Sequence, residues 1–315
     1  MSYTGPEFES PQPRRPRRGP LTVALAALVP GALLGWGVYE TLGDGGSGGA
    51  GRTAATSASR PVSSAPAPAA SRGDDGKVSG SPSAPSGGSG ALRGKVVVVD
   101  PGHNPGNFRH TAEINRQVDI GTNSKECDTT GTSTNDGYTE ASFSLDLAHR
   151  LRDLLEREGA TVRLTHDGDS PPWGPCVDER ARFGNAAHAD AAISLHADGS
   201  AAGHHGFHVI LPGSVHAGAA DTRPIVGPSH ELGVRIADTY RRATGEPPAN
   251  YVGDGTGLVT RTDLGGLNLS TVPKVFIECG NMRDDTDAAL LTSGTWRQRA
   301  AQGISEGIVS FLRVS

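Results

Sequence analysis

Chemically capable side chains follow three apolar runs that have the composition of buried strands. His103 comes shortly after a run of four valines, His196 ends a second apolar run, and Glu278 lies near the end of a third. In an open α/β sheet, the reactive groups lie just beyond the carboxyl ends of the strands. Glu140 opens a long helical segment between the first two runs. Two imidazoles and a carboxylate are the ligand set of a catalytic zinc site, and the second glutamate is suited to act as general base for a water molecule.

Each of these residues also has a structural explanation. A single histidine after a strand is more often a packed or surface residue, and the chain has 11 histidines. Glu140 fits the ordinary place of an acid in the first turn of a helix. Glu278 is harder to explain, because a carboxylate in an apolar strand is costly unless it is paired or functional. Spacing alone leaves both interpretations open. Other histidines that resemble ligands by their position are His204, His205, His208 and His216.

The hydrophobic pattern predicts a fold that could bring these strand ends together. Phe143, Leu147 and Leu151 recur every three or four residues and form one apolar helix face, which ends before Gly159. Continuous apolar strands suit a sheet that is covered by helices on both faces. We therefore expect one α/β domain over residues 92–315, with a mostly parallel, twisted sheet flanked by helices. The predicted strands are Lys95–Asp100, Thr161–Thr165, Ala191–His196, Phe207–Leu211 and Lys274–Cys279, and the predicted helices are Glu140–Glu158, Val177–His188, Ser229–Thr244 and Thr295–Leu312.

The first 91 residues have the composition of a membrane anchor and a tether. Residues 1–20 contain the basic cluster Arg14–Arg18, and residues 21–39 form an uncharged run that is long enough to cross a hydrocarbon core of roughly 30 Å. The basic cluster favours a cytoplasmic N-terminus with the rest of the chain outside. Residues 40–91 are mostly Gly, Ser, Ala and Pro, which predicts a disordered linker. We expect a single-pass signal anchor in the cell membrane, with cleavage and secretion as the second choice.

The charge and composition exclude several classes of protein. The formal net charge is −5 at pH 7, whereas a general nucleic-acid binder normally carries a basic surface, so we expect no nucleic-acid partner. Only one long apolar run is present, which excludes a polytopic membrane protein. The 44 glycines and 22 prolines are too many for a uniformly packed chain, which agrees with an unstructured segment.

Four motifs follow one another in order between residues 95 and 312. They are Val98-Val99-Asp100-Pro101-Gly102-His103, Glu140 at the start of its helix, Ile193-Ser194-Leu195-His196-Ala197 with Arg180–Ala186 before it, and Pro273–Met282 around Glu278. Together they resemble the type-3 family of zinc-dependent N-acetylmuramoyl-L-alanine amidases, which trim bacterial peptidoglycan. The resemblance implies that His103, Glu140 and His196 bind one Zn²⁺ per chain and that Glu278 takes a proton from the attacking water.

The resemblance also implies the substrate, which is peptidoglycan or its muropeptide fragments. The bond cleaved is the amide between the lactyl group of N-acetylmuramic acid and the L-alanine of the stem peptide. Arg261, in the loop before the last strand, is a candidate for binding a substrate carboxylate, and a solvated loop arginine is the alternative. The chain departs from the family at Asn104-Pro105, where glycines are frequent, and at Asp198, where Asn is common. Neither position is a ligand.

The three cysteines are Cys127, Cys176 and Cys279. Outside the cytoplasm, Cys127 and Cys176 can pair, because both lie in polar segments, whereas Cys279 lies on a predicted buried strand and is expected to stay reduced. A Cys127–Cys176 disulfide would hold the polar insert Asn104–Tyr138 near the site. Two free surface thiols are the alternative, and zinc ligation by Cys127 is not needed once a His₂Glu set is complete.

Two other functions stay open on the sequence alone. The first is a catalytically silent, membrane-tethered wall-binding or divisome scaffold, and the second is a zinc peptidase acting on stem peptides or proteins. All four site residues are present, which favours the amidase over the scaffold. We expect a monomeric catalytic domain, and the sequence does not indicate whether an activator protein is required.

Overall fold

The computed structural model describes residues 90–314, and the structural statements below concern these residues. The predicted cytoplasmic segment 1–20, the signal anchor 21–39 and all but the last two residues of the linker 40–91 lie outside them. None of the helices between residues 90 and 314 combines the length and the apolar character that crossing a lipid bilayer requires.

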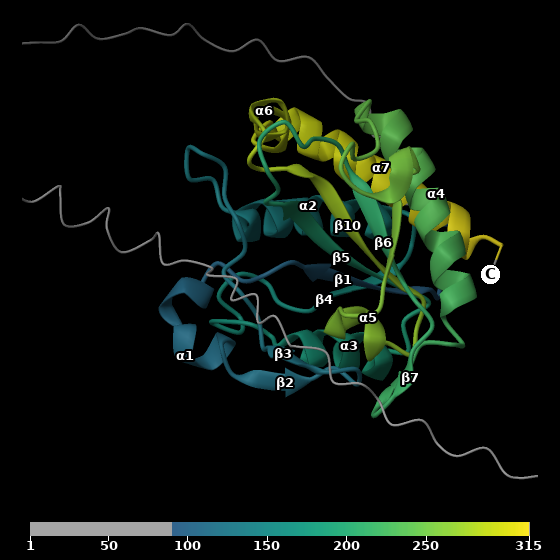
Figure 1. Cartoon of the computed structure of the whole chain (residues 1–315). Coiled ribbons are helices and arrows are strands. Elements are labelled where there is room, and N and C mark those ends of the chain that lie inside the picture. Colours follow the sequence, from purple (N-terminus) through teal and green to yellow (C-terminus); the bar gives the residue numbers. More distant parts are fainter. Residues whose placement is uncertain (1–89, 315) are drawn as a thin grey trace, which may run out of the picture. The chain divides into compact units, whose positions relative to one another are not determined.

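Six strands form the central sheet in the order β4-β1-β5-β10-β6-β9 (Figure 1). All neighbouring strands are parallel except β10 and β6, which are antiparallel. The predicted α/β domain with a mostly parallel sheet is therefore confirmed. In chain order the strands are β1 (Val96–Pro101), β4 (Thr161–Leu164), β5 (Ala191–Asp198), β6 (His208–Pro212), β9 (Leu258–Arg261) and β10 (Lys274–Asn281).

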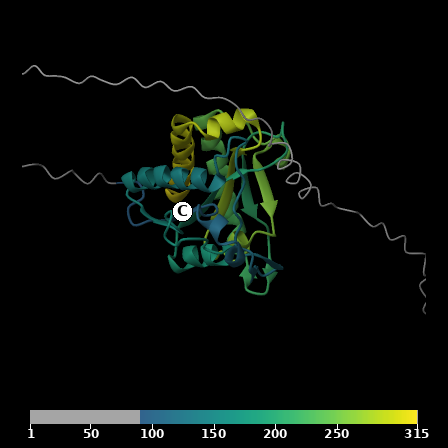
Figure 2. The same ribbon diagram turned by 90° about the vertical axis from the view of Figure 1, so that its left-hand side faces the viewer.

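One face of the sheet carries the main hydrophobic core. Helices α2 (Glu140–Arg157), α4 (Val226–Thr244) and α7 (Gly294–Leu312) cover this face, and Figure 2 shows α2 and α7 on the same side of the strands. Because strand side chains alternate between faces, Val97 and Val99 of β1 point into this core. The predicted apolar face of α2 is buried with them, since Phe143, Leu147 and Leu151 are all fully buried.

Helices α4 and α7 approach each other closely at two glycines of α7. A Cβ atom at Gly303 would lie 2.8 Å from the Cα of Tyr240, and one at Gly307 would lie 2.6 Å from the Cα of Ile236. Both distances are shorter than van der Waals contact with a backbone atom that cannot move aside. Glycine is therefore required at both positions for this packing.

The opposite face of the sheet is polar toward its carboxyl edge. A small apolar cluster of Val98, Ala192 and neighbours lies under helix α3 (Val177–Ala186). The next row across the sheet contains Asp100 and Ser194, and the row after it contains His196 and Glu278, since these residues are register partners. The sheet thus separates the apolar core on one side from the candidate site residues of β5 and β10 on the other.

The polar insert between β1 and α2 is folded. It contains η1 (Asn107–Arg109), α1 (Thr111–Ile114) and a hairpin of β2 (Gln117–Asp119) and β3 (Ser124–Glu126). The sequence reasoning did not predict these elements or strand β9. The other short elements are the pair β7 (His216–Ala217) and β8 (Ala220–Asp221), η2 (Gly253–Gly255), α5 (Gly265–Asn268) and α6 (Asp285–Leu291).

Helix α4 begins at Val226, three residues before the predicted start at Ser229. Pro228 lies in its first turn, where the missing N–H of proline would have no helical partner in any case.

Candidate active site

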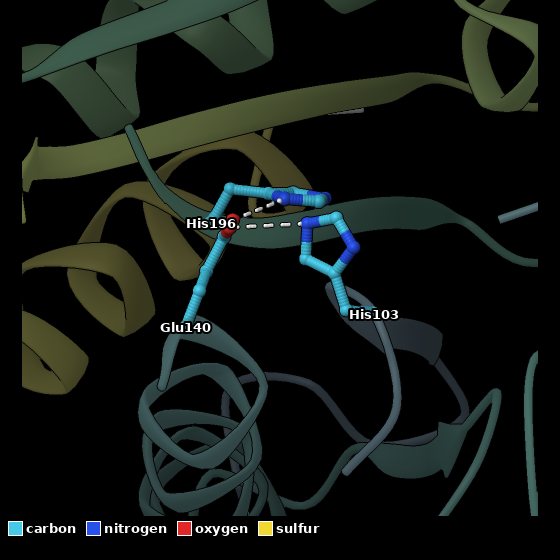
Figure 3. A group of neighbouring side chains, drawn as sticks. All are labelled: His103, Glu140 and His196. Atoms are coloured by element: carbon cyan, nitrogen blue, oxygen red, sulfur yellow. Dashed lines mark hydrogen bonds and ion pairs between the residues drawn. The ribbon is translucent and has the colours of Figure 1, made fainter. Parts of the chain in front are cut away.

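His103, Glu140 and His196 come together from three separate parts of the fold (Figure 3). His103 follows β1 and has a φ of 61°, a left-handed conformation that is uncommon for a residue with a side chain and that is concentrated at functional sites. Glu140 is the first residue of α2, which is capped by the Thr139 hydroxyl accepting from the Ser142 N–H. His196 lies on β5, near its carboxyl end.

The carboxylate of Glu140 lies between the two imidazoles. Its Oε1 is 2.8 Å from His196 Nδ1, and its Oε2 is 3.1 Å from His103 Nε2. One ligand atom from each of the three residues lies within 4.8 Å of the other two. A tetrahedral zinc ion with bonds of about 2.0–2.1 Å separates its ligand atoms by roughly 3.3 Å. The donor set and its spacing therefore fit a zinc ion.

The charges of this group also suit a divalent cation. Burial opposes ionisation of Glu140, but the two imidazoles outweigh it and hold the pKa of this carboxyl well below its usual range. Burial likewise disfavours protonated His103, yet the Glu140 and Asp128 carboxylates raise the pKa of His103 well above its usual value. The carboxylates of Glu140 and Asp128 therefore favour positive charge at this position, and a bound cation would take the place of a proton on His103.

Glu278 lies beside this group on β10. Its register partners are His196 on β5 and His208 on β6, so the three side chains form one row across the sheet. The Oε2 atom of Glu278 is buried and has no hydrogen-bond partner within residues 90–314. Burial and the neighbouring Glu140 and Asp198 carboxylates raise its pKa well above the ordinary value. A carboxyl with a raised pKa is a good proton acceptor near neutral pH.

A cavity of about 230 Å³ joins these residues. Its walls include all three candidate ligands together with Glu278, Arg261 and Phe276. The ring of Phe276 stacks on the His196 imidazole, with centroids 5.3 Å apart and planes 4° from parallel. A second cavity of the same size adjoins it and contains Lys125 and Leu264 in its wall. A substrate in the first cavity would touch the metal ligands and the proton acceptor at once.

Arg261, the predicted carboxylate binder, lies in the wall of the first cavity but is already partly engaged. Its Nε and Nη2 donate to the two carboxylate oxygens of Asp263, at 2.8 and 2.7 Å. Lys125 of the β2–β3 hairpin donates to the same carboxylate at 3.2 Å. Arg261 is the last residue of β9 and not the loop residue that the sequence had suggested, and this ion pair holds the hairpin against the end of that strand.

Cys127 and Cys176 form a disulfide bond, as expected, and Cys279 is reduced and buried. Burial raises the pKa of the Cys279 thiol, which makes it a poor nucleophile. The disulfide joins the end of the β2–β3 hairpin to the start of α3, where the Val177 N–H also donates to the Cys127 carbonyl at 2.7 Å. The insert is therefore held next to the site, in agreement with the sequence interpretation.

The sequence reasoning missed several polar residues around the site. His208 was treated only as one of four confusable histidines, yet it is buried next to Glu278. Tyr251 donates its hydroxyl hydrogen to Asp198, the last residue of β5, at 2.8 Å. Asp128 lies beside His103, Ser194 lies beside His196, and Asp100 is bonded to Ser194. For Asp100 a signal existed, because an acid that ends a run of four valines is rarely buried without a role.

The comparisons with known proteins agree with this site. The profile of a family described as N-acetylmuramoyl-L-alanine amidase matches residues 97–310. Over 223 residues the chain is 42% identical to the N-acetylmuramoyl-L-alanine amidase Rv3717 of Mycobacterium tuberculosis. This alignment covers 70% of this chain and 88% of that protein. Its fold is similar to crystal structures of the amidase Ami1 from Mycobacterium smegmatis (39% identity, TM-score 0.65, 71% of this chain and 99% of that one) and from Mycobacterium abscessus (39%, 0.64, 70% and 100%).

The matched region contains His103, Glu140, His196 and Glu278. An enzyme of peptidoglycan hydrolysis is therefore favoured over a silent scaffold. With a profile match over most of the folded part and a relative at 42% identity, this chain belongs to the N-acetylmuramoyl-L-alanine amidase family.

Proposed function

We propose that the domain is a zinc amidase in which His103, Glu140 and His196 hold one Zn²⁺ and Glu278 is the general base. The bond cleaved joins the lactyl group of N-acetylmuramic acid to the L-alanine of the stem peptide. One observation carries the proposal: three ligand side chains from distant parts of the chain lie within 4.8 Å of one another, beside a fourth, acidic side chain that has a buried and unpartnered oxygen.

The chain's own groups divide the chemistry between them. When bound, Zn²⁺ supplies Lewis acidity that polarises the scissile carbonyl and acidifies the attacking water. Glu278 accepts the proton of this water and then delivers it to the nitrogen of the leaving L-alanine. Burial and two neighbouring carboxylates raise the pKa of Glu278, which matches the base to this transfer. The stacked ring of Phe276 keeps the His196 imidazole in one plane.

Arg261 is proposed to bind a carboxylate of the stem peptide. Within residues 90–314, its Nη1 donates no hydrogen bond, although Nε and Nη2 are held by Asp263. Asp263 thus orients the guanidinium and leaves one edge for the substrate. We expect Arg261→Gln to raise KM about tenfold on a muropeptide whose stem peptide has a free carboxylate at its second residue. The difference should disappear on the amidated form of the same peptide, and an equal loss on both forms would contradict the assignment.

The protein is proposed to act outside the cytoplasm, tethered to the cell membrane through residues 21–39. The uncharged run after a basic cluster supports this location, as does a disulfide, which persists mainly in oxidising compartments. Cell fractionation of the full chain tests it. We expect the protein in the membrane fraction, and we expect deletion of residues 21–39 to remove it from that fraction. An unchanged distribution would contradict the anchor.

Digestion of purified muropeptides tests the reaction itself. We expect mass spectrometry to find free N-acetylmuramic-acid glycan and an intact stem peptide, and we expect chelation to abolish turnover and added Zn²⁺ to restore it. Cleavage within the stem peptide would instead identify a peptidase. An absence of cleavage at full zinc occupancy would identify the scaffold.

A further inference from the structure

Asp100 is a fully buried acid that the proposed reaction does not use. Its Oδ1 accepts from the Thr165 hydroxyl at 2.6 Å and from Arg180 Nη1 at 2.7 Å. Its Oδ2 accepts from the Ser194 hydroxyl at 2.8 Å and from Lys274 Nζ at 3.4 Å. A buried charge with four donors is expensive to assemble, and an apolar residue would fill the same space at lower cost. This arrangement calls for a role beyond packing.

The donors around Asp100 determine its charge. Burial would raise the pKa of this carboxyl, but Arg180 and Lys274 outweigh burial and hold it well below the usual range. Asp100 is therefore an anion and can only accept hydrogen bonds. Since a serine hydroxyl has one hydrogen, Ser194 commits that hydrogen to Asp100 Oδ2.

The direction of this bond fixes the next one. Ser194 Oγ also lies 3.2 Å from Nε2 of His196. With its own hydrogen committed, the serine oxygen must accept here, so Nε2 of His196 carries a hydrogen. In the neutral imidazole, the lone pair is then on Nδ1, which is the atom 2.8 Å from Glu140 Oε1. The chain of hydrogen bonds from Asp100 through Ser194 to His196, called the relay below, thus leaves the Nδ1 atom of His196, which faces Glu140, free to bind a metal ion.

The His103 imidazole is oriented by Thr129 and Asp128, and Arg180 links Asp128 to Asp100. Nδ1 of His103 lies 3.1 Å from the Thr129 carbonyl and 3.4 Å from Asp128 Oδ1, and both of these groups accept. Nδ1 therefore carries a hydrogen, which leaves Nε2 facing Glu140. Arg180, which is only 5% exposed, donates to Asp128 Oδ2 at 2.8 Å and to the His103 carbonyl at 2.9 Å, in addition to Asp100.

We propose that Asp100, which Arg180 holds in place, and Ser194 are positioning residues that set the tautomer and the orientation of His196 for metal binding. The inference rests on the proposed zinc site. Hydrogen-bond partners of metal-bound histidines typically contribute 10–100-fold to metal affinity. Asp100, Ser194 and Arg180 are not part of the wall of the first cavity, so their effect is expected in zinc affinity before turnover.

Three variants test the relay. Ser194→Ala removes the acceptor of the His196 Nε2 hydrogen. Asp100→Asn changes the group that Ser194 faces: its amide can donate to Ser194, which would turn the serine hydrogen toward Nε2 and place the imidazole hydrogen on Nδ1. Ser229→Ala is the matched control, because Ser229 is an equally buried serine whose hydroxyl accepts from the Lys274 N–H instead.

The measurements are the zinc dissociation constant, by competition with a chromophoric chelator, and the melting temperature of the metal-free protein. We expect Ser194→Ala to weaken zinc binding by about 10-fold or more, Asp100→Asn to weaken it further, and Ser229→Ala to change it by less than about twofold. A role in folding alone would lower the melting temperature of both serine variants and leave zinc affinity equal to that of the wild type, which would overturn the inference.

The outcomes separate this inference from the proposed function. A wild-type protein that binds no zinc would overturn both. A wild-type protein that binds zinc, together with an unchanged Ser194→Ala affinity, would overturn the relay alone. Ser194→Ala decides the question by itself if Asp100→Asn does not fold.

Discussion

Glu278 of β10 and His196 of β5 are direct neighbours in a parallel strand pair, so the proposed base and a proposed metal ligand stand at the same level of the sheet. This relationship places the proton acceptor and the ion on one rigid surface. Strands hold such groups more accurately than loops do. Four changes test this site and other buried groups of the domain.

The first concerns the general base. Glu278→Gln keeps the shape of the side chain but cannot accept the proton, so we expect kcat on muropeptides to fall by about 10²–10⁴-fold. Zinc affinity should stay within about threefold of the wild type, because Glu278 is not one of the proposed ligands. Steady-state kinetics and chelator competition measure the two effects. Glu306→Gln, on the exposed side of α7, serves as control, and a fully active Glu278→Gln would exclude this role.

The second concerns the disulfide between Cys127 and Cys176. The two residues are 49 positions apart, and closing a loop of that length stabilises a protein by about 4 kcal/mol in the chain-entropy model. We expect the double Cys→Ala variant to lose about 2–4 kcal/mol of unfolding free energy in urea. Reductant should lower the stability of the wild type to the same level and leave the variant unchanged. A wild type insensitive to reductant after unfolding and refolding would contradict the bridge.

The third concerns Glu246, which is buried against Asp287 and lies near Asp284. Burial and these two acids raise the pKa of Glu246 to about 8. The folded state therefore holds a proton that the unfolded state has released above about pH 4.5, so stability declines as pH rises toward and through 8.

Thermal melts at pH 6 and pH 9 measure this effect. We expect the melting temperature of the wild type to be lower at pH 9 than at pH 6, by about 2–4 °C for each kcal/mol of unfolding free energy that is lost. In Glu246→Gln, whose amide still donates to Asp287, the melting temperature should fall clearly less between the two pH values. An equal fall in melting temperature in both proteins would show that the proton on Glu246 does not contribute to stability.

The fourth concerns His208, which is buried between Asp198 and Arg261 beside Glu278. Burial and the Arg261 charge outweigh Asp198 and lower the pKa of His208 to about 4. Because the unfolded imidazole takes up a proton near pH 6.5, stability is complete above that pH and is lost as pH falls toward 4. Urea unfolding at pH 7 and pH 4.5 should show a smaller loss for His208→Asn than for the wild type. His216→Asn, an exposed histidine on β7, should behave as the wild type does.

Strand ends in a parallel sheet share one edge, so the sequence could indicate that these residues meet, but their assignment as a zinc site also needed the resemblance to the amidase family. His103 and His196 each follow an apolar run, and such runs indicate buried strands without knowledge of tertiary contacts. The pairing of Cys127 with Cys176 was predictable by a similar argument, since Cys279 was assigned to a buried strand. The N-terminal anchor and linker remain predictions, because they lie outside residues 90–314.

Other features depend on contacts that spacing does not encode. Strand β9 is four residues long and contains Thr260 and Arg261, so its hydrophobic pattern is too weak to predict a strand. It is defined by its pairing with β6. The β2–β3 hairpin is fixed by contacts to a loop about 140 residues later, such as Lys125 to Asp263. The position of Asp100 was read correctly as a strand end, but its bond to Ser194 follows from a register that the sequence does not state.

The two unlike faces of the sheet have a consequence for protein engineering. The close glycine contacts between α4 and α7 lie on one side of the strands, whereas His196 and Glu278 lie on the other; Glu140, at the start of α2, reaches the site from the helical side. Stabilising substitutions in α4 and α7, which carry none of the proposed site residues, can thus be selected for heat tolerance with little interference with catalysis, which makes this domain a suitable starting point for a durable enzyme that degrades cell walls.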